Sequence, residues 1–330
     1  MPQMTAFQVV DFARPPEHRP CARPEPEAGE LLIRIHACGL NFADLLMMQG
    51  RYQDTPAPPF TLGLECAGEV VGRGVGCTIP LGTRVAVYAG QGGLAEYGSF
   101  PEAACIPLPP DTPYDEAAGL LITYGTSHLA LTHTAGLRAG ETLAVIGAAG
   151  GVGLTAVEIG AQLGARVIAV ARGAEKCAIA RTAGAAETID SDTAGEQGGL
   201  KAGLKALGGV DVVYDAVGGT LGEAAFRALN RGGRFLLIGF AGGTPPALPL
   251  NHALVKNISI HGLYWGGYRE IAPQAFRRSL DEVLRDHAAG HLRPHVSHRL
   301  PFARVGEALE LLRNRQSSGK IVIAIDGSSF

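Results

Sequence analysis

The chain has 330 residues, enough for two domains of ordinary size around a large buried core. Its formal net charge is −3, so there is no electrostatic reason to expect a nucleic-acid or anionic-membrane partner. Hydrophobic residues make up 46%, too many for a disordered chain. The 46 glycines are about twice the usual ~7% share, so they need a structural explanation.

No apolar run reaches the ~18 residues of a membrane-spanning helix, and charged residues and prolines within 11–17 interrupt any signal peptide. The six cysteines are widely spaced and form no CxxC pair, a pattern typical of reduced thiols in the cytosol. We therefore expect a cytoplasmic protein with no membrane segment.

The N-terminal region, residues 1–118, predicts a small β-barrel. Short apolar strands at Leu31–Ile35, Glu69–Gly72 and Arg84–Val87 are separated by turns rich in proline and glycine.

The middle of the chain alternates apolar strands with helical patterns. A helix with Val152, Ala156, Ile159 and Leu163 on one face ends at Gly164. The predicted strands are Thr142–Gly147, Arg166–Ala171, Thr188–Asp190, Val210–Asp215, Arg234–Gly239 and Ile258–Leu263. Continuous apolar strands in βαβ alternation predict a parallel sheet covered on both faces, and hence an α/β fold.

The C-terminal region returns to mixed structure. One helix carries Phe276, Leu280 and Val283, a second begins near Val305, and a final strand covers Lys320–Ile325. We expect this strand to join the N-terminal domain. A nucleotide-binding domain, 119–255, is therefore predicted to be inserted between 1–118 and 256–330.

The strongest local motif is GAAGGVG, Gly147–Gly153, between the first strand of the sheet and its helix. A turn that binds a pyrophosphate needs tight backbone, close approach of N–H groups and close helix packing, and each demand excludes a Cβ. The motif departs from GxGxxG because Ala148 occupies the first glycine position. The predicted cofactor-binding positions in it are Ala149, Gly150, Gly151, Val152 and Gly153.

The end of the second strand indicates which dinucleotide binds. An NAD site places an acidic residue about 20 positions after the turn, where this chain has Ala171 followed by Arg172 and Lys176. Two cations can pair with a 2′-phosphate, which favours NADPH. The alternative is that Arg172 and Lys176 are solvated surface charges.

Four segments together carry a resemblance that runs the full length of the chain. They are CGLNFADLLMMQGRY (Cys38–Tyr52), PFTLGLECAGEVVGRG (Pro59–Gly74), GAAGGVGLTAVEIGAQLGARVIAVA (Gly147–Ala171) and GKIVI (Gly319–Ile323). With these, the chain resembles the zinc-free quinone oxidoreductases (zeta-crystallin-like) among the medium-chain dehydrogenases/reductases. The resemblance implies a GroES-like β-barrel domain, built from both chain ends, around a Rossmann domain, and a homodimer.

The residues do not provide for zinc, which needs three or four Cys, His or carboxylate ligands. Where zinc-containing relatives carry Cys, His and Cys ligands, this chain has Asn41, Leu64 and a residue near Ile122; one carboxylate, Glu65, remains. Gly290 and Pro294 interrupt the histidine-rich segment from His287 to His298, so no metal is expected there either.

Without a Lewis acid, hydride transfer suits acceptors that are already electrophilic, such as quinones and enones. The resemblance implies that Asn41 and Tyr52 donate hydrogen bonds to a quinone oxygen and that Thr126 lies beside the nicotinamide. Cofactor contacts are implied for four further residues: Gly239, Phe240, Trp265 and Lys320, the last near the phosphates. Ser191 stands where the family often has a tyrosine, which leaves the adenosine contacts open.

Plainer roles are open for three of these residues: a turn-forming Asn41, a packed loop aromatic for Tyr52, and a core or dimer-interface Trp265. We expect an NADPH-dependent quinone oxidoreductase with a small-molecule electrophile as its partner. The alternatives are an NADPH-dependent enone reductase of the same fold and a non-catalytic NADPH-binding protein. RNA binding is not expected, because the chain has no basic stripe or RNP motif.

Overall fold

A computed structural model describes residues 2–194, 199–325 and 327. The chain divides into two compact units: unit 1 is Met1–Ile122 with Pro294–Phe330, and unit 2 is Thr123–Arg293. The insertion of one unit into the other was predicted, but the second crossing lies at 293/294 and not at 255/256. The reason is that β14 (Ser259–Gly262) pairs with the sheet of unit 2, which keeps the following helix in that unit.

Unit 2 contains a parallel sheet in the strand order β11-β10-β9-β12-β13-β14 among the described residues. Its strands are β9 (Thr142–Ile146), β10 (Arg166–Ala171), β11 (Glu187–Asp190), β12 (Val210–Asp215), β13 (Leu229–Leu237) and β14. The chain moves outward from β9 to β10 and β11, then returns to the other side of β9. This reversal between β9 and β12 is the switch point at which doubly wound sheets bind dinucleotides.

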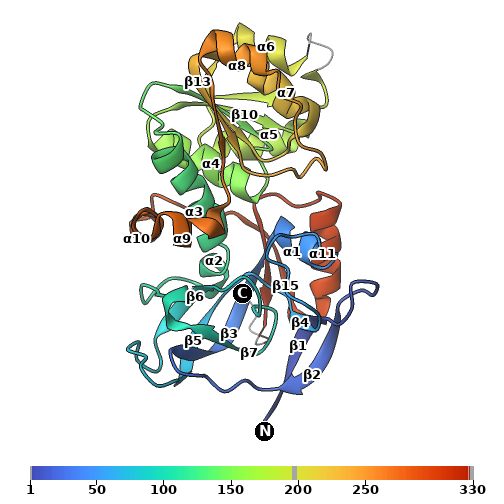
Figure 1. The fold of residues 1–330 in the computed structure, drawn as a ribbon, viewed down its shortest axis with the longest axis vertical. Helices are drawn as coiled ribbons and strands as arrows, with labels where there is room; N and C mark the ends of the chain where they lie inside the picture. The colour runs from blue at the N-terminus through green and yellow to red at the C-terminus, as the bar shows by residue number, and fades with distance from the viewer. Residues whose placement is uncertain (1, 195–198, 326, 328–330) are drawn as a thin grey trace. The chain divides into compact units, whose positions relative to one another are not determined.

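The helices of unit 2 follow the predicted alternation, as Figure 1 shows. They are α3 (Leu121–His128, which begins in unit 1), α4 (Gly151–Gln162), α5 (Gly173–Thr182), α6 (Leu200–Ala206), α7 (Gly219–Ala228), α8 (Leu250–Lys256), α9 (Tyr268–Ile271) and α10 (Pro273–Ala288), with a π-helical turn at Leu129–Thr134 and a 3-10 turn at Trp265–Gly267. Gly164 has φ +79°, so it ends α4 in the left-handed conformation expected of a C-terminal glycine. The stretch Gly195–Gly209, which mixes Gly, Lys, Leu and Ala, predicts a loop that leads into a short helix. The helix is α6, and 195–198 lie outside the described residues.

Unit 1 is β-rich. Its strands are β1 (Gln3–Val9), β2 (Glu17–Ala22), β3 (Glu30–Leu40), β4 (Phe60–Thr61), β5 (Glu65–Arg73), β6 (Arg84–Tyr88), β7 (Tyr97–Pro101), β8 (Cys105–Pro107), β15 (Val296–Pro301) and β16 (Lys320–Ala324). Its helices are α1 (Phe42–Met47), α2 (Tyr114–Ala117) and α11 (Val305–Arg313), with 3-10 turns at Glu102–Ala104 and Phe302–Arg304. The larger sheet runs β15-β16-β3-β5-β6-β8, with β7 also on β3, and the smaller one runs β2-β1-β4.

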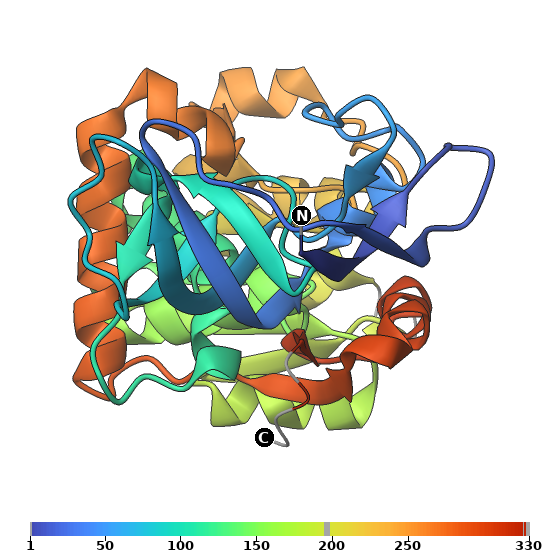
Figure 2. The same cartoon turned by 90° about the horizontal axis from the view of Figure 1, so that it is seen from below.

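The two chain ends meet at the β3–β16 pair. The strands are antiparallel, with Ile321 opposite Leu40 and Ile323 opposite Cys38. In Figure 2 the red C-terminal segment lies alongside the blue strands of the N-terminal region. The prediction that the last strand joins the N-terminal domain is therefore confirmed.

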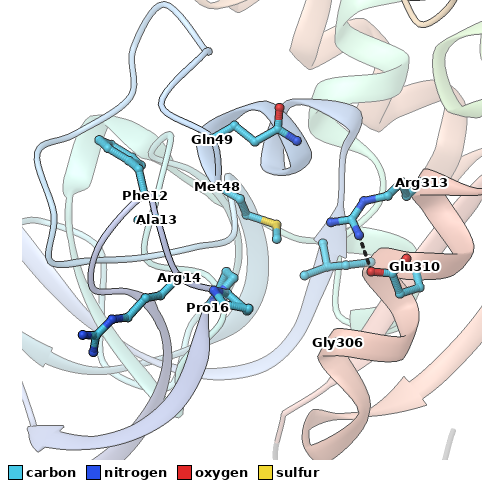
Figure 3. A pocket seen from close by; sticks show the side chains of 11 residues that line it. Phe12, Ala13, Arg14, Pro16, Met48, Gln49, Gly306, Glu310 and Arg313 are labelled. Carbon is cyan, nitrogen blue, oxygen red and sulfur yellow. Dashed lines mark hydrogen bonds and ion pairs between the residues drawn. The ribbon is translucent and has the colours of Figure 1, made fainter.

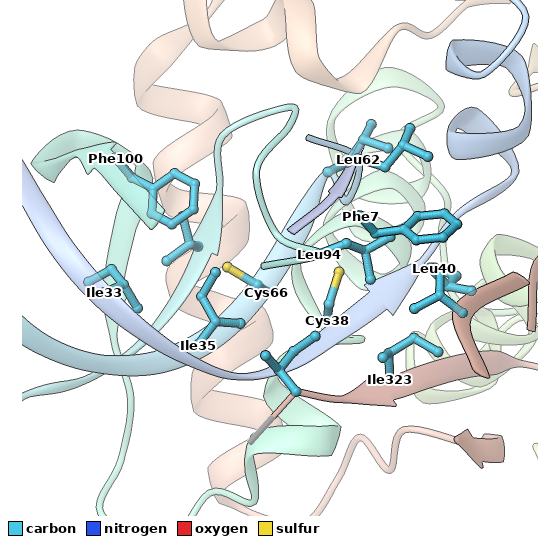
Figure 4. Packing of buried hydrophobic residues seen from close by; sticks show 14 of the residues in the cluster. Phe7, Ile33, Ile35, Cys38, Leu40, Leu62, Cys66, Leu94, Phe100 and Ile323 are labelled. Atoms are coloured by element: carbon cyan, nitrogen blue, oxygen red, sulfur yellow. The ribbon is translucent and has the colours of Figure 1, made fainter. Parts of the chain in front are cut away.

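The core of unit 1 lies between its two sheets. Figure 4 shows Phe7 of β1, Cys38 of β3 and Leu94 of the loop before β7 converging there, each at most 5% exposed. Unit 2 has a separate core beneath its parallel sheet, with Phe226 of α7 edge-to-face on Phe235 of β13 at 5.5 Å between ring centroids. Each unit thus has the apolar interior of an independent domain, and the predicted α/β class is confirmed.

Candidate functional site

The predicted site residues fall in two places, a buried polar cluster in unit 1 and the carboxyl edge of the parallel sheet in unit 2. The cluster begins where β3 passes into α1. The Asp44 carboxylate accepts the backbone N–H of Asn41 at 2.8 Å and that of Gly63 at 3.2 Å. Full burial raises the pKa of Asp44 to about 7, against the lowering effect of those two bonds and of Lys320. Asp44 thereby fixes the turn that carries Asn41.

Glu65, at the start of β5, is the centre of this cluster. Its Oε1 accepts hydrogen bonds from Lys320 Nζ at 2.5 Å and from Asn41 Nδ2 at 3.1 Å, while its Oε2 accepts the backbone N–H of Ile122 at 3.0 Å. Lys320 Nζ also donates to Asn41 Oδ1 at 2.7 Å. Glu65, Lys320 and Asn41 are 1%, 4% and 9% exposed. The sequence alone indicated Glu65 only as the carboxylate that remained from a zinc site.

The Asn41 amide is fully engaged inside the protein. Its Nδ2 donates to Glu65 and, at 3.2 Å, to the carbonyl of Gly39, and its oxygen accepts from Lys320. An amide nitrogen has two hydrogens. A hydrogen bond from Asn41 to a substrate oxygen, as the resemblance implies, therefore requires one of these internal bonds to be released.

Tyr52 lies in the loop after α1, partly buried against the core of unit 1. Its backbone N–H donates to Thr55 Oγ1 at 3.1 Å, and that hydroxyl donates back to the Tyr52 carbonyl at 2.6 Å. Burial raises the pKa of the Tyr52 phenol, with smaller contributions from Tyr88, Asp54 and Asp44. Tyr52 is thus a packed loop aromatic, and its contact with a substrate stays a prediction.

In unit 2 the glycine turn follows β9 directly. Gly147 has φ +81° and makes the tight bend, which explains how Ala148 can occupy the first position of the usual motif. A Cβ at Gly153 would lie 2.1 Å from the Gly147 carbonyl oxygen, so α4 can pack against the turn only with glycine there. Gly150 precedes α4 and is exposed, and a Cβ there would have no neighbour nearer than 3.4 Å. The exposed backbone before a helix N-terminus fits a pyrophosphate.

The two predicted phosphate ligands follow β10, Arg172 directly and Lys176 within α5, and two acids at the end of β11 were not predicted from the sequence. Asp190 lies opposite Ala171 in the β10–β11 register and accepts the backbone N–H of Gly173 at 2.9 Å. Asp192 pairs with Arg172 at 3.5 Å, and both side chains are more than half exposed. An exposed pair of this kind is worth about 0–1 kcal/mol, which a phosphate can displace. The signal in the sequence that could have indicated these acids is TIDSD, which places Asp190 at the end of β11 and Asp192 two residues later.

Asp215 and Gly239 lie at the same edge of the sheet. Asp215 is the last residue of β12, and Gly239 lies two residues after the end of β13. Asp215 Oδ1 accepts the backbone N–H groups of Val217 and Gly218 at 2.9 and 2.8 Å, and burial raises the pKa of this carboxyl. The Gly239 N–H donates to the Asp215 carbonyl at 3.3 Å, and Phe240 is 39% exposed beside Gly218. Gly239 and Phe240 are therefore on the edge where the glycine turn also lies.

Thr126 lies in α3, next in sequence to Gly125, on which Trp265 packs. Trp265 is 5% exposed, and its indole packs so closely on Gly125 that a Cβ there would lie 2.6 Å from the ring. On its other side the Phe276 ring is 4.8 Å away between centroids. Trp265 is therefore a core residue of unit 2, one of its two plainer alternatives. Thr126, adjacent to Gly125, is buried at 7% exposure.

Ser127 anchors this helix through a buried hydroxyl cluster that the sequence did not indicate. Its Oγ lies 2.8 Å from Thr155 Oγ1, 2.9 Å from the Tyr214 hydroxyl and 2.8 Å from the Val152 carbonyl. The cluster ties α3 to the first turns of α4 and to β12. It holds the segment bearing Thr126 rigidly to the helix that begins at the glycine turn.

An open pocket of about 390 Å³ lies elsewhere in unit 1 (Figure 3). Phe12, Arg14 and Pro16 line one side, and Met48 and Arg313 are among those opposite, with Arg313 paired to Glu310. None of the predicted site residues lines it. It therefore adds nothing to the predicted chemistry.

Within the described ranges, no three His, Cys, Asp or Glu side chains are grouped so that they could hold a metal ion. The same part of the chain contains no helix with both the length and the apolar character needed to cross a membrane.

Two family models match the chain, "Alcohol dehydrogenase GroES-like domain" over 27–110 and "Zinc-binding dehydrogenase" over 151–284. The bovine (Bos taurus) quinone oxidoreductase-like protein 2 is 38% identical over 301 residues, 90% of this chain and 85% of the relative. The chain belongs to the quinone oxidoreductase family of zinc-free medium-chain reductases. Its fold is the family's GroES-like domain with a Rossmann-like parallel sheet, as predicted.

Two further relatives of this oxidoreductase are informative. Bovine prostaglandin reductase-3 is 32% identical over 328 residues, 94% of this chain and 85% of the relative. The quinone oxidoreductase from Thermus thermophilus, whose structure was also solved as a complex with NADPH, is 33% identical with a TM-score of 0.85. That match covers 98% of this chain and 100% of the bacterial one. Asn41 and Leu64, at positions where the resemblance implies zinc ligands in other relatives, lie within the match of the first family model and outside that of the "zinc-binding" model.

Proposed function

We propose that this protein is an NADPH-dependent, zinc-independent quinone oxidoreductase. The observation that carries the proposal is the glycine turn of unit 2 at the switch point of its sheet, in a chain whose relatives include an NADPH-bound quinone oxidoreductase. Bound NADPH supplies a hydride from its nicotinamide ring to an electrophilic acceptor.

The chain's own residues have the tasks of binding and orientation. The N–H groups at the start of α4 hold the pyrophosphate, with Gly150 leaving room for its approach. Arg172 and Lys176 pair with the 2′-phosphate, and Asp192 releases Arg172 in the process. Gly239, Phe240 and Thr126 lie toward the nicotinamide end, as the family resemblance implies. Asn41 and Tyr52 are proposed on the substrate side.

A cytoplasmic homodimer completes the proposal. Leu250, Leu254 and Val255 of α8 are each at least 67% exposed, and α8 precedes β14, the last strand of the sheet among the described residues. An exposed apolar stretch and a sheet edge are both suited to burial against a second copy. Sedimentation analysis of the purified protein tests this part separately.

The activity test measures NADPH oxidation by absorbance, with para-benzoquinone and naphthoquinone acceptors, with a panel of enones, and with no acceptor. We expect quinones to accelerate NADPH oxidation well above the rate without acceptor. A rate no higher with any quinone than without one refutes the proposal. The Gly150→Ala variant, which should bind NADPH more weakly and keep its fold, is the matched control, because a contaminating activity would keep its KM for NADPH in this preparation.

An enone reductase is the second candidate, favoured by the prostaglandin reductase-3 relative. A higher kcat/KM on enones than on quinones selects it. Tight NADPH binding without turnover of any acceptor selects a non-catalytic NADPH-binding protein instead.

A further inference from the structure

Lys320 is a charged side chain with an unusually enclosed position. It is the first residue of β16, is 4% exposed, and directs its ammonium to Glu65 Oε1 and Asn41 Oδ1 at 2.5 and 2.7 Å. A buried charge is tolerated only with a partner of opposite sign and satisfied hydrogen bonds. The Glu65 carboxylate meets both needs, and the Ile122 N–H satisfies its second oxygen.

Two glycines make room for the lysine stem. A Cβ at Gly39 would lie 2.8 Å from Lys320 Cε and 2.1 Å from the Ala118 carbonyl oxygen. A Cβ at Gly119 would lie 2.8 Å from Lys320 Cγ. Both distances to the lysine are shorter than real Cβ contacts, so the two glycines leave room for the lysine stem; Gly39 also allows the close approach of the Ala118 carbonyl. Lys320 therefore occupies a built site.

We propose that Lys320 is the cation of this buried cluster and acts as a positioning residue: its ammonium orients Asn41 and holds the turn into α1 in place. Asn41, Leu64 and Ile122, where zinc-containing relatives are expected to have ligands, lie within or directly beside this cluster. The Lys320 cluster thus includes or adjoins the sequence positions at which the resemblance implies zinc ligands in those relatives. This role deepens the proposed function, on which its substrate side rests.

Removing the Lys320 ammonium is expected to disturb the Asn41 turn but not the cofactor-binding edge of unit 2. Glu65 and Lys320 make two of the three hydrogen bonds of the Asn41 amide, and the Gly39 carbonyl accepts the third. Without the ammonium, the Asn41 oxygen loses its donor and Glu65 is buried without a cation. The Asn41 turn then loses its fixed geometry, while the cofactor-binding edge in unit 2 keeps its own contacts.

Chemical rescue tests the cation site without any substrate. Lys320→Ala removes three methylene groups and the ammonium, which n-propylammonium replaces atom for atom. Breaking a buried pair should lower the folding equilibrium constant by about 100-fold or more. We expect n-propylammonium to raise the unfolding midpoint of this variant in a saturable manner, and tetramethylammonium, which has no N–H donor, to leave it unchanged. Equal effects of the two cations would overturn the proposal.

A double variant keeps the test decisive if Lys320→Ala does not fold. Lys320→Ala with Glu65→Gln removes both charges, so we expect a folded protein that does not respond to n-propylammonium. Because the Lys320 ammonium is 4% exposed and bonded to Glu65 and Asn41, we expect the double variant to bind NADPH with wild-type affinity, a result that would also exclude the phosphate contact implied for Lys320 by resemblance. Its kcat/KM for the acceptor should be lower by about tenfold or more, because Asn41 is no longer oriented. Wild-type kcat/KM in the double variant overturns the positioning role. The rescue readout needs no acceptor, so failure of quinone turnover is distinguishable from failure of this inference.

Discussion

The glycine turn of unit 2 predicts that two of its glycines fail in different ways when changed to alanine. At Gly153 the new Cβ would lie 2.1 and 2.8 Å from the carbonyl oxygen and carbon of Gly147, and 3.0 Å from Ala148 Cα. All three are backbone atoms, so no side chain can rotate away. Overpacking of this kind costs about 3 kcal/mol, and the better helix propensity of alanine returns about 1. We expect Gly153→Ala to destabilise unit 2 by about 2 kcal/mol, or about 4–8 °C in Tm.

At Gly150 the same substitution meets no obstacle in the protein. Its φ of −79° suits alanine, and the nearest atom to the new Cβ is the Gly147 oxygen at 3.4 Å. Alanine lowers the conformational entropy of the unfolded chain, which stabilises the folded state by about 0.4–1 kcal/mol. Alanine is also a poorer helix cap than glycine, which offsets this gain, so the free energy of unfolding should change by less than about 0.5 kcal/mol. The exposed methyl group nevertheless faces the expected pyrophosphate. We expect the Kd for NADPH to rise at least about tenfold, a loss of about 1.4 kcal/mol.

Urea unfolding followed by circular dichroism and a fluorescence titration with NADPH separate these two roles. We expect a stability defect for Gly153→Ala and a binding defect without a stability defect for Gly150→Ala. Wild-type NADPH affinity in Gly150→Ala would show that the phosphates do not approach the turn at that residue. Wild-type stability in Gly153→Ala would refute the packing argument.

Three further outcomes follow from particular contacts. Arg172→Ala with Lys176→Ala should raise the Kd for NADPH at least about tenfold more than that for NADH, since charge-assisted bonds contribute about 1.5–3 kcal/mol each; equal effects in titrations would remove the 2′-phosphate role. Trp265→Ala should lower the free energy of unfolding in urea by about 3–5 kcal/mol, because the indole fills the space between Gly125 and Phe276. A decrease below about 1 kcal/mol would place Trp265 outside the core. Burial lowers the pKa of His128, so below pH ~6.5 the unfolded state binds more protons than the folded state and the free energy of unfolding should fall as the pH drops. His128→Gln should reduce the slope of the free energy of unfolding against pH, and an unchanged slope would assign the effect to other groups.

The regular part of the fold was predictable because its strands are continuous in sequence and apolar. The bounds of β10 and β12 match the predicted Arg166–Ala171 and Val210–Asp215. β3 was predicted only as Leu31–Ile35 but runs from Glu30 to Leu40. Its pairing with β5 shifts register twice, after Leu32 and after Ile35. The first shift adds an extra residue to β5, and the second adds His36 to β3. The second shift breaks the two-residue alternation of β3 directly after Ile35, so the pattern ends there although the strand continues.

The site was predictable to the extent that its contacts are local. The glycine turn is seven consecutive residues, and the Asn41–Asp44 pair has the spacing of a helix cap. The partners of Lys320, by contrast, are 255 and 279 positions away in the sequence. Only the fold brings them together, so the lysine was assigned to phosphates by resemblance, an assignment that stays a prediction.

The high glycine content can now be traced to physical causes beyond the cofactor. Gly39 and Gly119 leave space for the stem of Lys320, and Gly125 leaves space for the Trp265 indole. In each case a glycine allows a large side chain to lie against backbone, at a position where any Cβ would collide. Gly125→Ala should therefore mimic the loss of Trp265 packing without removing the indole. Close approach of backbone to side chains is thus a second demand for glycine in both units, separate from the demand for backbone close to a phosphate.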